Sequence, residues 1–200
     1  MPRQADHDRR RSELTDALLR IAATRGLQAV TMREVAAEAG VSLRVVQYHM
    51  TDKATLLTAG LAELAARLDR RVTARAAAAG TALTARQVFG IVLEAIVPAD
   101  DTARADALAW AAFYAAALTD PTLGADGRNH PDALEGWLTA RLARAQAEGE
   151  APAGLDARVE VVLLLALANG LTSSVLGRQR SAEDALAVLH HQLDRVLGTS

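Results

Sequence analysis

Residues 31–53 read TMREVAAEAGVSLRVVQYHMTDK, and this stretch decides the fold. Thr31 and Glu34 have the spacing of a capping box, in which the threonine hydroxyl accepts from a free backbone N–H and the glutamate reaches back, so we expect a helix to begin after Thr31. Gly40 can adopt a positive φ without penalty and suits a tight turn. Ser42 is a good N-cap for the next helix. The stretch therefore predicts two short helices around a tight turn.

The second of these short helices is expected to have an exposed face. Val35, Ala36 and Val46 are the apolar positions that pack inward. The positions left pointing outward are Ser42, Leu43, Arg44, Gln47 and Tyr48. Because the major groove of DNA is wide enough to admit a helix, this lining is typical of nucleic-acid recognition. Two short helices around a glycine also occur in helical proteins with no DNA role, which is the alternative interpretation.

The rest of the chain is also predicted to be helical, because alanine dominates and proline and glycine are sparse within the apolar stretches. A first helix is expected to end near Gly26, and further helices to begin after Asp52, Thr84 and Ser181, each of which can cap a helix. The third helix is expected at 43–49, the seventh at 132–148 and the eighth at 156–176. An all-α fold of about nine helices follows.

Composition and charge exclude several classes of protein. With no cysteine among 200 residues, neither a disulfide framework nor a thiolate zinc site is available. The arginine-rich N-terminus lacks the apolar segment of a signal peptide, and the longest apolar run, 159–168, is too short to cross a bilayer. We therefore expect a cytoplasmic protein. Residues 1–55 carry nine Arg and Lys against seven Asp and Glu, whereas the whole chain has a net charge of −2, which fits a nucleic-acid-facing front part.

An enzyme is the main competing class. The five histidines, at positions 7, 49, 130, 190 and 191, accompany no serine or cysteine nucleophile motif, no HExxH and no glycine-rich phosphate loop. The pair at 190 and 191 is more simply interpreted as part of the ninth helix than as a metal site. We therefore expect no catalysis, no cofactor and no metal.

The stretch 31–53 resembles the helix-turn-helix of the TetR (tetracycline repressor) family. The resemblance is carried by Thr31, Val35-Ala36, Ala39-Gly40-Val41-Ser42, Tyr48-His49, and Lys53 followed by Leu56-Leu57, and Asn169-Gly170-Leu171 resembles a turn in the family's eighth helix. It implies an N-terminal helix-turn-helix DNA-binding domain, here expected at 1–52 with 1–8 disordered. A C-terminal effector-binding and dimerisation domain is expected at 53–200.

The resemblance also implies roles for single residues. Arg44 would donate two hydrogen bonds to a guanine, and Leu43 would touch a thymine methyl. The residues that would hold phosphates are Thr31, Ser42, Tyr48, His49 and Lys53. Gln47 and Met50 depart from the family, which usually has tyrosine and phenylalanine at these positions. Gln47 is therefore not counted among the phosphate contacts, and contact with a base is the alternative for it.

A ligand cavity enclosed by helices four to eight is a further implication of the resemblance. The expected pocket residues are Phe89, Trp110, Phe113, Tyr114, Trp137, Arg141, Asn169 and Thr172, with His130 as another polar candidate. Ordinary core packing is the alternative for the aromatic members. The segment 124–131 is rich in helix breakers, so we expect an interruption there, either a gate to the pocket or a plain loop.

The eighth and ninth helices offer more apolar surface than one small core absorbs, so we expect a two-fold dimer through them. The expected interface residues are Val159, Val162, Leu163, Leu167, Leu186, Leu189 and Leu193. The sequence thus predicts a ligand-responsive repressor that binds a palindromic DNA operator as a homodimer and is released by a small, largely apolar effector. An activator of the same family and a helical interaction protein without a DNA role are the alternatives.

Overall fold

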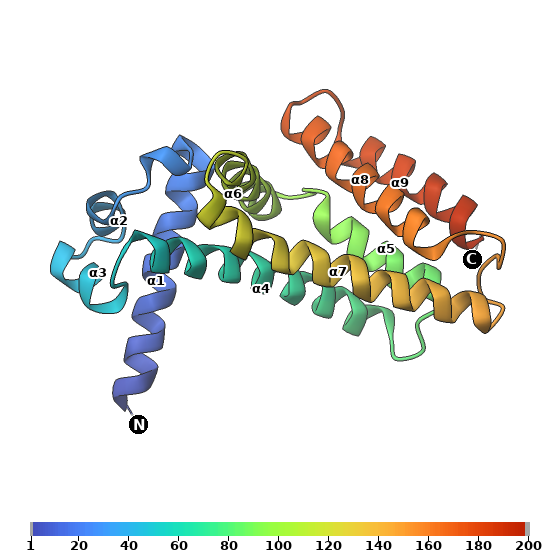
Figure 1. Ribbon diagram of the computed structural model, residues 1–200, viewed down its shortest axis with the longest axis horizontal. Helices are drawn as coiled ribbons and strands as arrows, with labels where there is room; N and C mark the ends of the chain where they lie inside the picture. Colours follow the sequence, from blue (N-terminus) through green and yellow to red (C-terminus); the bar gives the residue numbers. More distant parts are fainter. Residues whose placement is uncertain (1, 199–200) are drawn as a thin grey trace. The chain divides into compact units, whose positions relative to one another are not determined.

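The computed structural model describes the backbone of residues 2–198, and the side chains of that range apart from residues 2–5 and 121–130. Within this range the regular structure is entirely helical, which confirms the predicted all-α fold. The helices are α1 (Pro2–Arg25), a 3-10 turn η1 (Leu27–Ala29), α2 (Met32–Glu38), α3 (Leu43–His49), α4 (Lys53–Ala79), α5 (Ala85–Ile96), α6 (Asp101–Ala117), α7 (Pro121–Ala147), α8 (Ala157–Leu176) and α9 (Ala182–Leu197) (Figure 1).

Capping residues set several of these boundaries. Thr84 and Gln87 form a complete capping box at the start of α5, as predicted. At the start of α2 only half of the predicted box is present, because Thr31 accepts from the backbone N–H of Glu34 at 3.1 Å but the Glu34 carboxylate accepts from Arg25 at 2.7 Å. A charge-assisted hydrogen bond to a guanidinium is stronger than one to a backbone amide, so the arginine takes the carboxylate.

The chain divides into two compact units, each described here by itself. Unit 1 comprises Met1–Ala66 and Ala105–Gly127, and unit 2 comprises Arg67–Arg104 and Arg128–Ser200. Unit 1 is therefore larger than the 1–52 domain expected from the sequence. The added segments complete one core with α1, α2 and α3 through Leu56, Leu57, Leu61, Leu64, Ala109 and Phe113. Burying these side chains removes apolar area that three short helices alone would leave in water.

Gly60 on α4 marks a close approach within unit 1. A Cβ at this position would lie 2.7 Å from Cδ2 of Leu18 and 3.1 Å from Cζ of Phe113, and both side chains are buried. Gly136 in α7 is a matched comparison, since a Cβ there meets no described atom within 4 Å.

We expect the Gly60→Ala variant to be less stable than the Gly136→Ala variant by about 1 to 3 kcal/mol, because both gain the same helix propensity and only the first overpacks a core. Urea unfolding followed by circular dichroism measures the difference. Equal shifts in the two midpoints would mean that α4 does not approach α1 and α6 as closely as described.

Unit 2 has its core between α5, α8 and α9. Phe89, Leu93 and Leu164 are fully buried there, and so are Leu189 and Leu193 of α9. The last two were expected at a dimer interface. That assignment is corrected, because these side chains fill the core of their own unit and have no exposed surface to offer a partner.

Polar contacts join the helices of unit 2 at their ends. Arg86 of α5 donates to a carboxylate oxygen of Asp194 on α9 at 2.8 Å. Arg104 donates to the carbonyl oxygens of Val175 and Leu176 at 3.2 and 2.9 Å. Since the last carbonyls of a helix have no intrahelical partner, Arg104 caps the C-terminus of α8.

Two helices are longer than the sequence predicted. α7 is continuous from Pro121 to Ala147 with Pro131 inside it, so the interruption expected at 124–131, and a gate formed by it, are not supported. Residues of α7 beyond Pro131, among them Leu138 and Leu142, are buried in unit 2, and packing of this kind outweighs local propensity. The side chain of His130 lies outside the described residues.

α1 begins at Pro2, whereas residues 1–8 were expected to be disordered. Arg9 pairs with Asp6 and, at 3.2 Å, with Glu13, and Arg10 pairs with Glu13 at 2.6 Å. Ion pairs three and four residues apart lie on one helix face and favour the helix, so these pairs support the first segment of α1.

α8 is long and apolar enough to cross a membrane by length and composition alone, with 20 residues and a mean hydropathy of 1.9. The sequence analysis considered only the shorter apolar run 159–168, which is too short to cross a bilayer. Such a helix is weak evidence for a membrane protein, because core helices pass the same test. The face of α8 formed by Val161, Leu164, Ala168 and Leu171 packs into the core of unit 2. α8 is therefore a core helix on this side.

Candidate nucleic-acid interface

α3 is a short helix fixed at its start and from beneath. Gly40 has a φ of 67°, in the left-handed region that a glycine adopts without strain, and it separates α2 from α3 as predicted. The Ser42 hydroxyl accepts from the backbone N–H of Val45 at 3.4 Å and caps the helix. Val46 and Met50 are fully buried beneath it. One face of α3 therefore packs into the core, and the opposite face lies at the surface.

The predicted DNA-contact residues lie on this outer surface of unit 1. The exposed members are Thr31, Ser42, Arg44, Gln47, Tyr48 and Lys53, and the half-buried members are Leu43 and His49. Tyr48 is 76% exposed. Each predicted residue thus has surface with which to contact a ligand, although contact with DNA itself stays a prediction.

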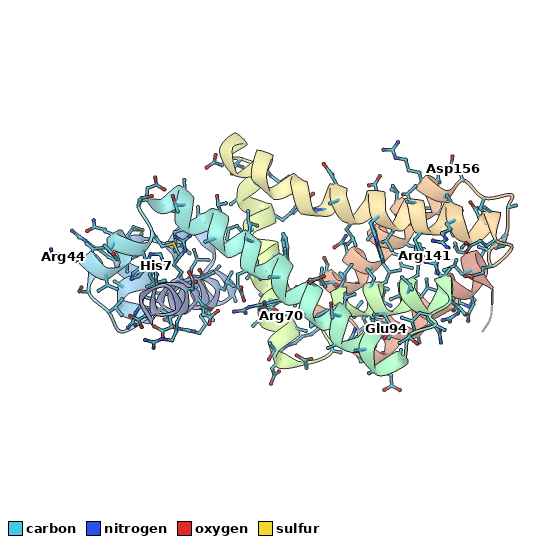
Figure 2. The ribbon with its side chains drawn as sticks, turned by 90° about the horizontal axis from the view of Figure 1, so that it is seen from below. His7, Arg44, Arg70, Glu94, Arg141 and Asp156 are labelled. Carbon is cyan, nitrogen blue, oxygen red and sulfur yellow. The ribbon has the colours of Figure 1, made fainter. Side chains whose placement is uncertain are left out.

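Three cations on α2, α3 and the start of α4 have no ion pair within the described residues. Among the residues that the structure describes, Arg33, Arg44 and Lys53 form no hydrogen bond or ion pair with another side chain, in contrast to Arg25, which pairs with Glu34. Figure 2 shows Arg44 at the outer edge of the ribbon. An unpaired cation can take an anionic ligand without first losing a partner. Arg33 was not among the predicted contacts.

α1 contributes to this surface, which the sequence analysis missed. Arg11 donates a hydrogen bond to the backbone carbonyl oxygen of His49 at 2.9 Å and so ties the end of α3 to α1. The His7 ring centroid lies 4.5 Å from that of His49 and 6.2 Å from that of Tyr48. The arginine-rich composition of the N-terminus was the available signal, but it does not indicate which helix the residues contact.

The environment of His49 favours its neutral form. Burial lowers the pKa of His49, the positive charges of His7, Arg10 and Arg11 lower it further, and Asp6 opposes this with a smaller effect. Nδ1 of the ring is buried without a hydrogen-bond partner in the described part of the chain. The local potential is therefore positive and suits an approaching anion.

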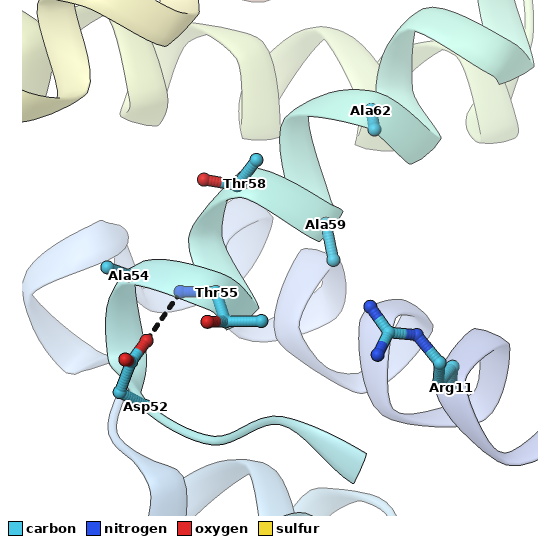
Figure 3. Close-up of a pocket in the computed structure, with 7 residues that line it drawn as sticks. All are labelled: Arg11, Asp52, Ala54, Thr55, Thr58, Ala59 and Ala62. Atoms are coloured by element: carbon cyan, nitrogen blue, oxygen red, sulfur yellow. Dashed lines mark hydrogen bonds between the residues drawn. The ribbon is translucent and has the colours of Figure 1, made fainter.

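A groove of about 530 Å³ opens beside the start of α4 (Figure 3). It is lined by Arg11, Asp52, Ala54, Thr55, Thr58, Ala59 and Ala62. Asp52 accepts from the backbone N–H of Thr55 at 2.7 Å, and this hydrogen bond lowers the pKa of the Asp52 carboxyl. The carboxylate thus caps α4. The groove belongs to unit 1 and shares none of its residues with the predicted effector pocket.

The eight predicted pocket residues are divided between the two units. Trp110, Phe113 and Tyr114 belong to unit 1, and Phe89, Trp137, Arg141, Asn169 and Thr172 belong to unit 2. The polar members have partners nearby: Arg141 lies 3.9 Å from Glu150, Asn169 donates to the carbonyl of Leu165 at 2.9 Å and Thr172 to that of Ile96 at 3.2 Å. Because neither unit holds all eight, they do not form one cluster within a unit, and the pocket stays a prediction.

The predicted dimer residues differ in exposure. Val159, Val162 and Leu163 of α8 are 53%, 42% and 52% exposed and form an uncovered apolar row. Val188 of α9, 40% exposed, was not predicted and adds to the apolar surface. Leu167 and Leu186 are partly buried and pack against the core of unit 2. An interface through α8 and α9 would therefore use the outward row and not the buried leucines of α9.

Comparison with known proteins relates the chain to bacterial regulators. Residues 14–59 match the family of bacterial regulatory proteins named after tetR, and residues 85–198 match the C-terminal part of BetI-type transcriptional repressors. The HTH-type transcriptional regulator BetI of Burkholderia mallei is 31% identical over 205 residues, which cover 98% of each chain. The BetI regulator of Rhizobium meliloti is 36% identical over 118 residues, covering 58% of this chain and 56% of the relative.

Solved structures show the same fold. A protein from Rhodococcus sp. described as a TetR-family transcriptional regulator is 27% identical, with a TM-score of 0.87 over 94% of this chain and 99% of its own. A transcriptional regulator from Saccharomonospora viridis, solved in complex with choline, is 22% identical, with a TM-score of 0.81 over 94% of this chain and 97% of its own. At that identity, the second similarity concerns the fold alone.

Proposed function

The chain belongs to the TetR family of bacterial transcriptional regulators, and from this premise we propose that it is a ligand-responsive repressor that binds a palindromic operator as a homodimer. As a member of this family it is a DNA-binding regulator and not an enzyme. The observation that carries the proposal is the exposed face of α3, where Arg44 has no ion pair within the described residues.

The DNA-reading role is assigned to the surface of unit 1. α3 enters the major groove, Arg44 and Leu43 meet base edges, and Gln47 is placed to reach a base as well. The phosphate contacts are assigned to Thr31, Ser42, Tyr48, His49 and Lys53. We keep the functional division at 1–52 for DNA reading and 53–200 for effector binding and dimerisation, with the start of α4 as structural support for the first.

The dimer is assigned to the outward face of α8 and α9. Val159, Val162, Leu163 and Val188 supply the exposed apolar surface that supports this assignment. A two-fold axis through this face would present two copies of α3 to successive major grooves, roughly 34 to 36 Å apart. The operator would then repeat its half-site in inverted orientation.

Repression and its relief are supported by the resemblance of residues 85–198 to BetI-type repressors. An effector that binds only one spacing of the two reading heads shifts the population toward that spacing and releases the DNA. The effector remains to be identified by screening, and choline is a reasonable first member of the panel because a protein of the same fold was solved with it. We place the protein in the cytoplasm, where its DNA lies.

The direct test is a mobility-shift assay with the DNA upstream of the gene for this protein, in the presence of excess random DNA. A shifted band that survives the competitor and contains two protein chains per duplex supports the proposal. If unlabelled upstream DNA and unlabelled random DNA at the same concentration removed the band equally well, binding would not be sequence-specific and the proposal would be contradicted. Higher transcription from that promoter with the protein than without it would replace the repressor by an activator.

Replacing Lys53 with alanine should weaken binding to all DNA sequences alike, because a phosphate contact carries no sequence information. The slope of log affinity against log salt concentration should become shallower by about 1 for each Lys53 lost. Arg144→Ala is the matched control, because this variant removes the same charge from unit 2, where Arg144 pairs with Glu148. An unchanged salt slope in Lys53→Ala would remove this residue from the phosphate contacts.

A further inference from the structure

An aromatic cluster joins α1 to the end of α3, and the contacts so far assigned to DNA do not include its α1 member. The rings of His7 and His49 are tilted against each other at 4.5 Å between centroids. Tyr48 stands edge-on to both, at 6.2 Å from His7 and 4.9 Å from His49. Two of these three residues, Tyr48 and His49, are proposed phosphate contacts, so His7 lies directly beside that part of the surface.

The charges around this cluster come from α1. Arg10 and Arg11 and the nearby carboxylate of Asp6 act on His49, while Tyr48 is its neighbour on α3 itself. For His7, the near carboxylate is that of Asp8, with Nδ1 of the histidine 3.9 Å from the oxygen. In the free protein, a proton on His49 is thus held close to other cations and to the second histidine.

We propose that His7 and His49 together form a proton-linked contact to a DNA phosphate, so that binding to the operator takes up one proton per subunit. This inference rests on the proposed function, because the phosphate is that of the operator. It makes α1 part of the DNA-binding surface and gives operator affinity a dependence on pH.

Simple electrostatics gives the number of protons and the sign. Two imidazolium rings 4.5 Å apart repel each other, so the pair takes one proton more readily than two. The charge of a phosphate raises the affinity of the pair for that proton. Burial and the neighbouring cations hold the pKa of free His49 below the ordinary value of about 6.5. Proton uptake at His49 therefore begins at the lowered pKa of the free protein and ends at the higher pKa of the DNA-bound pair.

Affinity for the operator should fall as pH rises through that window, by up to about tenfold per pH unit for each proton taken up. Above the pKa of the bound pair the pair is neutral in both states, and below the pKa of the free pair it is charged in both, so the affinity levels off at either end.

The test measures the affinity of the full-length protein for its upstream DNA by fluorescence anisotropy at constant ionic strength, between about pH 5.5 and 8.5, where histidine is the side chain that ordinarily titrates. Calorimetry in buffers of different ionisation enthalpy counts the protons. Wild type is compared with His7→Asn, His49→Asn and His7→Lys. His190→Asn is the control, because His190 contacts Glu94 within unit 2, with Nε2 3.0 Å from the carboxylate oxygen.

We expect the wild type and the His190→Asn variant to bind more tightly as pH falls, and the His7→Asn and His49→Asn variants to lose this slope. His7→Lys should bind tightly at high pH with little slope, because it carries the positive charge throughout. pH-independent binding by the wild type, or a full slope in both asparagine variants, would overturn the inference and leave the proposed function standing. Absence of specific binding at every pH would overturn the proposed function as well.

Discussion

Replacing Arg44 with alanine should weaken binding to the operator by about 1 to 3 kcal/mol per half-site, a factor of roughly five to 150 for each, while binding to random DNA changes far less. The reason is geometric. A guanidinium presents two parallel N–H donors that match the two acceptors of guanine in the major groove, and alanine leaves those acceptors unpaired.

The comparison between specific and random DNA separates this role from a general effect of charge. Arg144→Ala removes the same charge from unit 2 and should leave both affinities close to wild type. If Arg44→Ala weakened both kinds of DNA equally, Arg44 would be a phosphate contact. Titration of each variant by fluorescence anisotropy with a labelled duplex gives both affinities, and circular dichroism checks that the helix content is kept.

The double variant Val162→Glu and Leu163→Glu should convert the proposed dimer into folded monomers and abolish specific binding at concentrations where wild type binds fully. Both side chains are exposed in the single chain, so the charges cost little there, whereas a dimer would have to bury four unpaired carboxylates at several kcal/mol each. Sedimentation velocity measures the mass, and the mobility-shift assay measures the binding.

Two further variants serve as controls for this experiment. Leu118→Glu places one such charge on an exposed apolar residue of unit 1 and should leave a dimer. Leu189→Glu should lower the stability of the chain itself, because Leu189 is fully buried within unit 2. A double variant on α8 that remains dimeric would place the interface elsewhere.

The helix-turn-helix was predictable because its signals are local. Thr31 and Ser42 cap α2 and α3, and Gly40 takes the positive φ, each within a few residues of the element that it limits. The side on which Val46 is buried also followed from helical periodicity. Where a residue's role is set by its neighbours along the chain, the sequence was sufficient.

Contacts between distant segments were not predictable. Nothing in the sequence places His7 against His49 or directs Arg11 to the carbonyl of His49, because this packing depends on how α1 passes α3. The same limit applies to α9, where Leu186 and Leu189 lie on one apolar stripe. Periodicity identifies the stripe but does not say that Leu189 is buried in its own subunit and Leu186 only in part.

The interruption predicted from helix-breaking residues was wrong. Pro131 and the glycines before it predicted an interruption, yet α7 continues through them. A proline within a helix costs about 3 kcal/mol or more, and burial of several leucines can offset a penalty of that size. Such an offset depends on tertiary contacts, so a local reading of the sequence misses it.

Methylation interference at guanine N7 on the upstream DNA tests the central claim, that α3 reads the major groove through Arg44, most directly. For the wild type, methylation of a guanine in each of two inverted half-sites, centred about ten base pairs apart, should block binding. With Arg44→Ala that interference should disappear while binding, though weaker, can still be measured. Interference at the same guanines in both proteins, or at none in the wild type, would contradict it.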